Sequence, residues 1–218
     1  MGAITRAAAN NITTGGVILP AAINDASVAS VTGLAQVSAG DGITLISSQT
    51  ASASASLSFT TGIDSTYRTY MFKFINILPA TNSVEFQFNL STDGGSNYNV
   101  TKTTTSFKTR HDESDASAEL SYFTNYDLAQ STAFQTLSRE QGNGADESCS
   151  GTLQLFNPSS TTYVKHFIAT TNFYNQGALC EGFYIGGYGN TTSAVNAIRF
   201  KMSSGNINAG TIHMYGIA

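Results

Sequence analysis

The residues of this chain whose chemistry could support catalysis or metal binding are three histidines, two cysteines and a group of carboxylates. His111 stands beside Asp112, Glu113 and Asp115, and these residue types could hold a metal ion or supply a general base. Metal ligands must converge on one point, whereas neighbouring side chains of a loop mostly splay into water. We therefore interpret the His111 group as a solvated loop and predict no metal site.

The remaining histidines and both cysteines give no catalytic pattern. His166 and His213 have apolar neighbours, which is typical of half-buried positions in a β-sheet. Cys149 and Cys180 permit one disulfide without implying it, and we favour two free thiols in a protein made in the cytosol. A catalytic pair of Cys149 or Cys180 with His166 is possible, but no sequence motif supports it. The stretch 148–151 (SCSG) lacks the G-x-S-x-G elbow of serine hydrolases.

Two glycine-containing stretches could suggest ion or phosphate binding. Residues 93–97 (DGGSN) resemble a calcium loop only loosely, because alternating oxygen ligands and a closing glutamate are missing, and a hairpin turn is the simpler interpretation. Gly182, Gly186, Gly187 and Gly189 precede no helix N-terminus, so they do not form a phosphate loop. We predict a non-enzymatic protein without a cofactor.

Tyrosines in the predicted loops leave one alternative open, the recognition of host surface glycans. Tyrosine rings can stack on sugars, but they also line ordinary protein interfaces, and tryptophan is absent. We favour the interface and keep glycan binding as the alternative. A polysaccharide-degrading enzyme would need paired carboxylates in a cleft, whereas the acids here cluster in one region. The tyrosines of the alternative are Tyr98, Tyr126, Tyr174 and Tyr188.

The composition excludes several classes of protein. The net charge is -4 and the basic residues are scattered, so no nucleic-acid footprint is visible. No apolar run reaches transmembrane length, and the start of the chain does not look like a signal peptide. Met1-Gly2 could suggest myristoylation, but Arg6 stands where serine or threonine is expected. We expect cytosolic synthesis followed by assembly, without membrane insertion.

The chain changes character near residue 50. Residues 1–50 contain no aromatic residue and only Arg6, Asp25 and Asp41 as charges, so they cannot build much of a core. Their apolar side chains need a partner. We predict an extended docking arm over 1–50, held by a neighbouring subunit. The apolar residues expected at that interface are Ile12, Val17, Ile18, Leu19, Ile23, Val28, Val31 and Leu34.

Alternating apolar and polar residues predict strands from residue 42 onward. Tyr70, Phe72, Phe74 and Asn76 should share one face of the strongest strand, and the next strand should point Val84, Phe86, Phe88 and Leu90 inward. The polar stretch 108–148 predicts a long loop insertion, or loops around a weak strand near 120–123. The pattern favours a jelly-roll-like antiparallel β-sandwich over 51–218. The predicted strands are 42–46, 51–59, 68–78, 84–90, 98–107, 150–156, 163–170, 183–186, 197–202 and 210–217.

Four stretches of the chain carry a resemblance to a known class of protein. They are 10–20 (NNITTGGVILP), 57–67 (LSFTTGIDSTY), 156–161 (FNPSST) and 205–216 (GNINAGTIHMYG). Together they look like virion proteins of tailed phages, particularly marine phages. The resemblance implies a particle protein, often trimeric, that decorates the capsid or forms a fibre and contacts capsid or tail proteins. It brings no set of functional residues and leaves head or tail location open.

Overall fold

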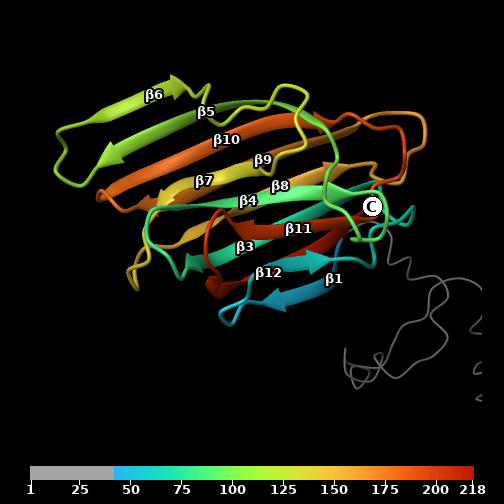
Figure 1. Ribbon diagram of the computed structural model, residues 1–218, viewed down its shortest axis with the longest axis horizontal. Helices are drawn as coiled ribbons and strands as arrows, with labels where there is room; N and C mark the ends of the chain where they lie inside the picture. The colour runs from blue at the N-terminus through green and yellow to red at the C-terminus, as the bar shows by residue number, and fades with distance from the viewer. Residues whose placement is uncertain (1–41) are drawn as a thin grey trace, which may run out of the picture. The chain divides into compact units, whose positions relative to one another are not determined.

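The computed structural model describes residues 42–218, and this part of the chain is built entirely from antiparallel strands and turns (Figure 1). It contains no helix, and hence none that could span a membrane. The strands are β1 (Ile43–Thr50), β2 (Leu57–Phe59), β3 (Thr69–Pro79), β4 (Val84–Ser91), β5 (Lys102–Asp112), β6 (Ala118–Tyr122), β7 (Gln135–Gln141), β8 (Cys149–Phe156), β9 (Lys165–Asn175), β10 (Leu179–Gly189), β11 (Ala197–Met202) and β12 (Ile207–Ile217).

Strand pairing forms one 12-stranded sheet, which folds over into two layers. The larger layer runs β1-β12-β3-β8-β9-β10-β5-β6, and the smaller one runs β7-β4-β11-β2. A single residue pair, Gln141 with Asn175, joins β7 to β9 and links the two layers. The predicted antiparallel β-sandwich is confirmed. The predicted strand 210–217 is part of β12, which lies between β1 and β3.

The core between the layers is a cluster of phenylalanine rings. Phe200 of β11 lies at its centre, with ring centroids 5.5 Å from Phe72 and 5.2 Å from Phe74. Phe86 of β4 packs 5.2 Å from Phe74 in an edge-to-face arrangement. Phe86 belongs to the smaller layer and Phe74 to the larger, so their contact pins the layers together. The four side chains of β4 predicted to point inward are all buried.

The face assignment predicted for the end of β3 is wrong at Asn76. Tyr70, Phe72 and Phe74 are buried as expected, but Asn76 is exposed and Ile77 takes the inward position. Asn76 adopts a left-handed conformation with φ 50°, and the pairing of β3 with β8 shifts register at this point. A bulge of this kind reverses the alternation of faces beyond it.

The β12 backbone opposite this bulge requires glycine. Gly210 has φ +113°, and a Cβ there would lie 2.5 Å from the carbonyl oxygen of Asn76. A side chain at position 210 would therefore meet both backbone strain and a backbone collision. The pairing of β3 with β12 and the pairing of β3 with β8 both shift register here, and regular pairing continues on the Phe74 side of the shift in both.

The sandwich begins earlier than the predicted boundary at residue 51. β1 covers Ile43–Thr50 and pairs with β12, so the end of the predicted arm belongs to the sheet. The strand predicted over 51–59 is shorter in the structure, because only Leu57–Phe59 pairs as a strand. Regular alternation of alanine and serine was a poor guide, since small side chains supply little area to bury.

The polar stretch 108–148 contains more regular structure than predicted. β5 continues to Asp112, the weak strand near residue 120 is β6, and Gln135–Gln141 forms β7. The inward side chains of β7 include Gln135 and Gln141, which are fully buried and hydrogen-bonded. Hydrophobic periodicity could not reveal this strand, because polar groups satisfied by hydrogen bonds occupy its core positions.

A loop between β6 and β7 covers the inner face of β5 and is held there by hydroxyl groups. The Thr104 hydroxyl donates to Gln135 Oε1 at 2.7 Å and accepts from the Leu128 amide at 2.8 Å. The Ser106 hydroxyl donates to the Phe123 carbonyl at 3.0 Å. The loop also packs the rings of Phe123 and Tyr126 against Phe183, so hydroxyl contacts and aromatic packing together hold it in place.

Candidate functional site

The outer face of the larger layer, which turns away from the core, carries the main exposed apolar surface near one edge. Four of the strands contribute to it, namely β6, β5, β10 and β9 (Figure 1). We call it the outer patch, and its residues, with their exposed fractions, are Leu120 71%, Ile168 56%, Tyr122 55%, Phe107 44% and Tyr184 39%.

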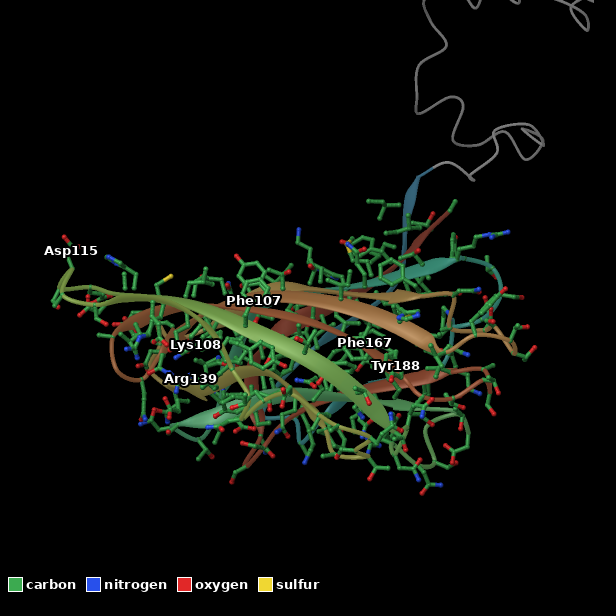
Figure 2. All side chains as sticks on the ribbon, turned by 90° about the horizontal axis from the view of Figure 1, so that it is seen from above. Phe107, Lys108, Asp115, Arg139, Phe167 and Tyr188 are labelled. Carbon is green, nitrogen blue, oxygen red and sulfur yellow. The ribbon has the colours of Figure 1, made fainter. Side chains whose placement is uncertain are left out.

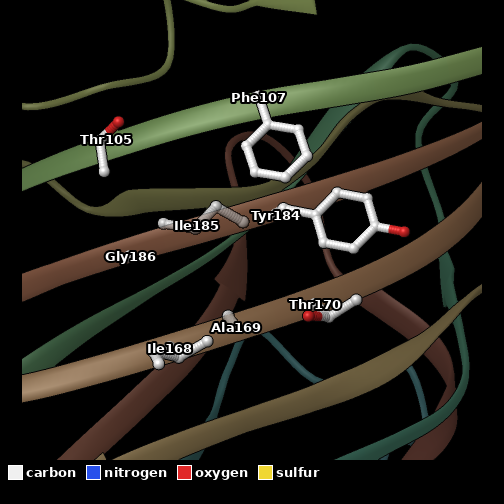
Figure 3. Close-up of a pocket in the computed structure, with 8 residues that line it drawn as sticks. All are labelled: Thr105, Phe107, Ile168, Ala169, Thr170, Tyr184, Ile185 and Gly186. Carbon is white, nitrogen blue, oxygen red and sulfur yellow. The ribbon is translucent and has the colours of Figure 1, made fainter. Parts of the chain in front are cut away.

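Strand register brings these side chains together. Phe107 lies directly opposite Tyr122 of β6 on one side and Tyr184 of β10 on the other. The rings of Phe107 and Tyr184 are stacked, 4.7 Å apart with an interplanar angle of 7° (Figure 3). Ile168 follows one row further along β9, opposite Gly186. Cross-strand pairing thus gathers residues that lie far apart in the sequence into one surface.

Glycines in β10 leave a hollow beside the stacked rings. The hollow measures about 320 Å³, with Phe107, Tyr184 and Ile168 around it and Gly186 as a position without a side chain (Figure 3). A second hollow of about 250 Å³ shares Thr105 and Gly186 with the first and reaches His166 and Tyr188. We call the two together the glycine hollow. Its lining has threonine hydroxyls but no carboxylate, lysine or arginine.

The four tyrosines of the glycan alternative do not form one platform. The Tyr126 ring packs 4.8 Å from Phe123, and burial raises the pKa of its hydroxyl to about 12. The Tyr98 ring lies 4.0 Å from the Arg199 guanidinium, and its hydroxyl is buried without a hydrogen-bond partner. Tyr174 and Tyr188 are half-buried on β9 and β10. Tyr188 alone lines the glycine hollow.

His111 and its acidic neighbours lie at the turn between β5 and β6. His111 Nε2 is 3.1 Å from Asp115 Oδ1, with both side chains largely exposed. Asp115 lies at the tip of this turn, at the opposite end of the molecule from Tyr188 (Figure 2). Within 42–218, no group of three or more histidine, cysteine or acidic side chains is arranged to hold a metal ion.

The two cysteines are free thiols in different environments. Cys149 of β8 is fully buried, and burial raises the pKa of its thiol to about 12, which suppresses the reactive thiolate. Cys180 of β10 is exposed and lies opposite His111 in the pairing with β5. His166, considered above as a partner for either cysteine, instead has its ring 6.0 Å from that of Tyr188.

A buried ion pair lies between the layers, beneath the outer patch. Arg139 donates from Nε and Nη2 to the two carboxylate oxygens of Glu181, at 3.0 and 2.6 Å. Its Nη1 donates to Glu140 Oε2 at 2.6 Å. Glu181 is fully buried, Lys108 is buried, and the Arg139 side chain is only 11% exposed; Figure 2 labels Lys108 and Arg139. This bidentate geometry has a structural function, since solvent cannot reach Glu181.

Lys102 is buried at the start of β5 without a carboxylate in ion-pair distance among the described residues. Its Nζ donates to Asn89 Oδ1 and to the Val100 carbonyl, the latter at 2.9 Å. Burial lowers the pKa of Lys102 to about 7. A neutral amine could act as a nucleophile, but no substrate could reach a side chain with 0% exposure.

Lys102 should make stability depend on pH. Its folded-state pKa lies below its ordinary value of 10.5, so the unfolded chain binds a proton that the folded chain releases. Stability therefore rises with pH, and from about pH 7 to about pH 8.5 we expect a gain of about 1.5 kcal/mol in wild type relative to Lys102→Met. Urea denaturation of both proteins across this range measures the difference. Equal pH slopes would contradict the prediction.

The expected interface residues of the arm, Ile12 to Leu34, lie outside the described residues. The outer patch, in contrast, contains none of the residues singled out from the sequence. Alternation along β5 puts Phe107 on one face and Ser106 and Lys108 on the other, but it does not show which of the two faces is buried. Recognising that Phe107 points outward requires knowing that the polar side chains of β5 point inward.

The described residues show a fold and two surface features that could bind a partner. Residues 42–218 form a two-layer antiparallel β-sandwich with an apolar patch and a neutral hollow on one outer face. Comparison with protein-family models, with curated proteins and with solved structures finds no match.

Proposed function

We propose that this protein is a non-enzymatic structural component of a tailed-phage virion that assembles with copies of itself. It decorates or stabilises the capsid or forms a short fibre, as a trimer attached to the particle through residues 1–50. The resemblance of four sequence stretches to phage virion proteins supports a location in the phage particle. The outer patch is the structural observation that supports assembly.

The outer patch is suited to contact with protein. Contiguous exposed apolar surface on a soluble protein marks an interaction site, and aromatic residues are enriched in such contacts. The patch combines two stacked rings with a third aromatic ring, that of Tyr122, and two aliphatic side chains, and none of its residues is charged. Covering each such side chain fully contributes about 1.5–3 kcal/mol, so a subunit that covers the patch gains several kcal/mol.

Self-association through the patch is testable with paired substitutions. Phe107→Ser with Tyr184→Ser removes the stacked rings, and we expect the assembled protein to dissociate toward monomer in multi-angle light scattering. Tyr163→Ser is the matched control, because Tyr163 is 68% exposed yet lies outside the patch. A wild-type protein that is monomeric at micromolar concentration, or a double variant that assembles normally, contradicts the proposed assembly.

Attachment through the arm has a separate test. Residues 42–218 contain the whole described core, so deleting residues 2–40 should leave a folded β protein. We expect this variant to keep its far-ultraviolet circular dichroism signal of β structure and to be absent from purified particles. Normal incorporation of the shortened protein into particles would rule out attachment by the arm.

A receptor-binding adhesin for host glycans is the second candidate, and the glycine hollow is the observation that favours it. A neutral lining with Tyr184, Tyr188 and threonine hydroxyls suits an uncharged sugar. A glycan array distinguishes this candidate. Selective binding that is lost in Tyr188→Ala would support it, and the absence of any selective signal would exclude it in favour of the purely structural function.

A further inference from the structure

β6 is an edge strand of the larger layer, and among the described residues it pairs only with β5 (Figure 1). Two backbone hydrogen bonds, one at each end of β6, show which of its backbone groups face β5. The Asp112 amide donates to the Ser117 carbonyl at 3.1 Å, and the Phe123 amide donates to the Ser106 carbonyl at 3.0 Å. In an antiparallel pair the groups alternate, so Glu119 also faces β5.

The intervening residues of β6 therefore turn their backbone groups away from β5. These are Ala118, Leu120 and Tyr122, which also place their side chains on the outer face and are exposed. Each offers an N–H donor and a C=O acceptor to the open edge. No proline interrupts the strand, and its single charged side chain, Glu119, is held by Arg110 Nε at 2.9 Å. Within residues 42–218 this edge thus presents a regular row of unpaired groups, which is a template for another strand.

We propose that β6 pairs antiparallel with β6 of a second copy of this chain, across a two-fold axis at Leu120. This inference rests on the self-association proposed above and identifies one of its contacts. Because the contact is two-fold, it joins copies in pairs, and a trimer would form through a different surface.

The sequence of β6 is self-complementary in this register. Leu120 faces Leu120 of the second copy, and Ala118 faces Tyr122 of the second copy, so a small side chain accommodates a large ring. Glu119 faces Ser121 of the second copy, so the two carboxylates are not opposed. Each carboxylate also keeps its own basic neighbours, Arg110 and Lys108. Neither charge repulsion nor bulk disfavours the pairing.

Pairing at this edge would also make the two outer patches continuous. Tyr122 and Leu120 belong to the patch, and the stacked Phe107 and Tyr184 follow on the next strands. The strand contact itself spans only Ala118–Tyr122, which is small compared with a standard interface of about 1,600 Å². It therefore acts where copies are already concentrated, as on a particle, where many weak contacts add up.

A cysteine at the axis tests the register directly. The exposed native thiol is first removed by Cys180→Ser, and Leu120→Cys is added to the full chain. Directly opposed residues that exchange both hydrogen bonds have Cα atoms about 5.5 Å apart, which suits a disulfide. Under mild oxidation we expect disulfide-linked dimer to form roughly tenfold or more faster than in a control, since pairing raises the effective thiol concentration.

The control is Tyr163→Cys in the same Cys180→Ser background. Positions 120 and 163 are similarly exposed, at 71% and 68%, but Tyr163 lies outside β6. Equal crosslinking rates at the two positions would overturn the inference. Non-reducing gel electrophoresis and peptide mass mapping give the rate and the linked position.

A proline variant separates edge pairing from contact through side chains. Leu120→Pro removes an N–H that points to the open edge and leaves the bonds to β5 intact, whereas Leu120→Ser keeps the N–H. We expect Leu120→Pro to abolish the pairing of two copies through β6, which Leu120→Ser only weakens, while a trimer formed through the other surface persists. If Leu120→Pro does not fold, as judged by circular dichroism, the cysteine result decides. A monomeric wild type refutes the self-association itself, while an assembling wild type without crosslinking at 120 refutes only the β6 contact.

Discussion

Replacing Phe200 by alanine is expected to destabilise the sandwich by about 3–5 kcal/mol, because it empties the centre of the phenylalanine cluster. The ring of Phe200 is fully buried and contacts Phe72, Phe74 and Phe86 within 5.9 Å of their centroids. These rings come from both layers, so neighbouring strands cannot move in to fill the space without breaking their pairing. At roughly 2–4 °C per kcal/mol for a domain of this size, the melting temperature should fall by roughly 6–20 °C.

Calorimetry or thermal circular dichroism measures this effect, with Tyr163→Ala as the control. Tyr163 is 68% exposed, so its truncation should change stability by no more than about 0.5 kcal/mol. A Phe200→Ala protein that melts together with this control would show that the aromatic cluster does not hold the layers together.

Arg139→Met should be comparably damaging for an electrostatic reason. The substitution leaves the Glu181 carboxylate with 0% exposure and without its bidentate partner. Breaking one side of a buried ion pair costs about 3–5 kcal/mol, because the remaining charge is neither solvated nor paired. Urea denaturation at neutral pH measures the loss.

Two comparisons show whether the loss comes from the unpaired charge. Arg139→Met combined with Glu181→Met removes both charges, and it should recover much of the stability. Arg110→Met breaks the more exposed ion pair with Glu119, where the side chains are 32% and 36% exposed, and should cost no more than about 1 kcal/mol. If the double substitution is as unstable as the single one, lost packing rather than uncompensated charge explains the effect.

The sequence predicted the aromatic strands well and the polar ones poorly. β4 alternates large apolar side chains with polar ones, and β3 places an aromatic ring at every second position from Tyr70 to Phe74, so both their existence and the inward faces of most residues followed from periodicity. Asn76 broke the pattern because a left-handed residue shifts the faces without changing the composition. β7 was missed because Gln135 and Gln141 occupy core positions through hydrogen bonds that only the folded chain supplies.

The candidate site could not be predicted because it depends on register between distant strands. Phe107 and Tyr184 are far apart in the sequence, and only the pairing of β5 with β10 stacks their rings. Tyrosine count and predicted loops instead drew attention to Tyr98 and Tyr126, whose rings pack against Arg199 and Phe123. Tyrosine was a reasonable residue type to expect at a recognition surface, but which tyrosines lie there follows only from the strand pairing.

The single Gln141–Asn175 pair that joins the two layers has a mechanical consequence. Beside this pair, the Gln176 amide donates to the Glu140 carbonyl at 3.0 Å, and away from this edge of β7 the layers meet mainly through packed side chains. Paired strands within a layer must instead break many hydrogen bonds together. A force that pulls the layers apart should therefore open the protein from this seam, while one that shears β12 past β1 and β3 meets the greatest resistance. β12 pairs with both β1 and β3, so such a shearing force must break two ladders of backbone hydrogen bonds.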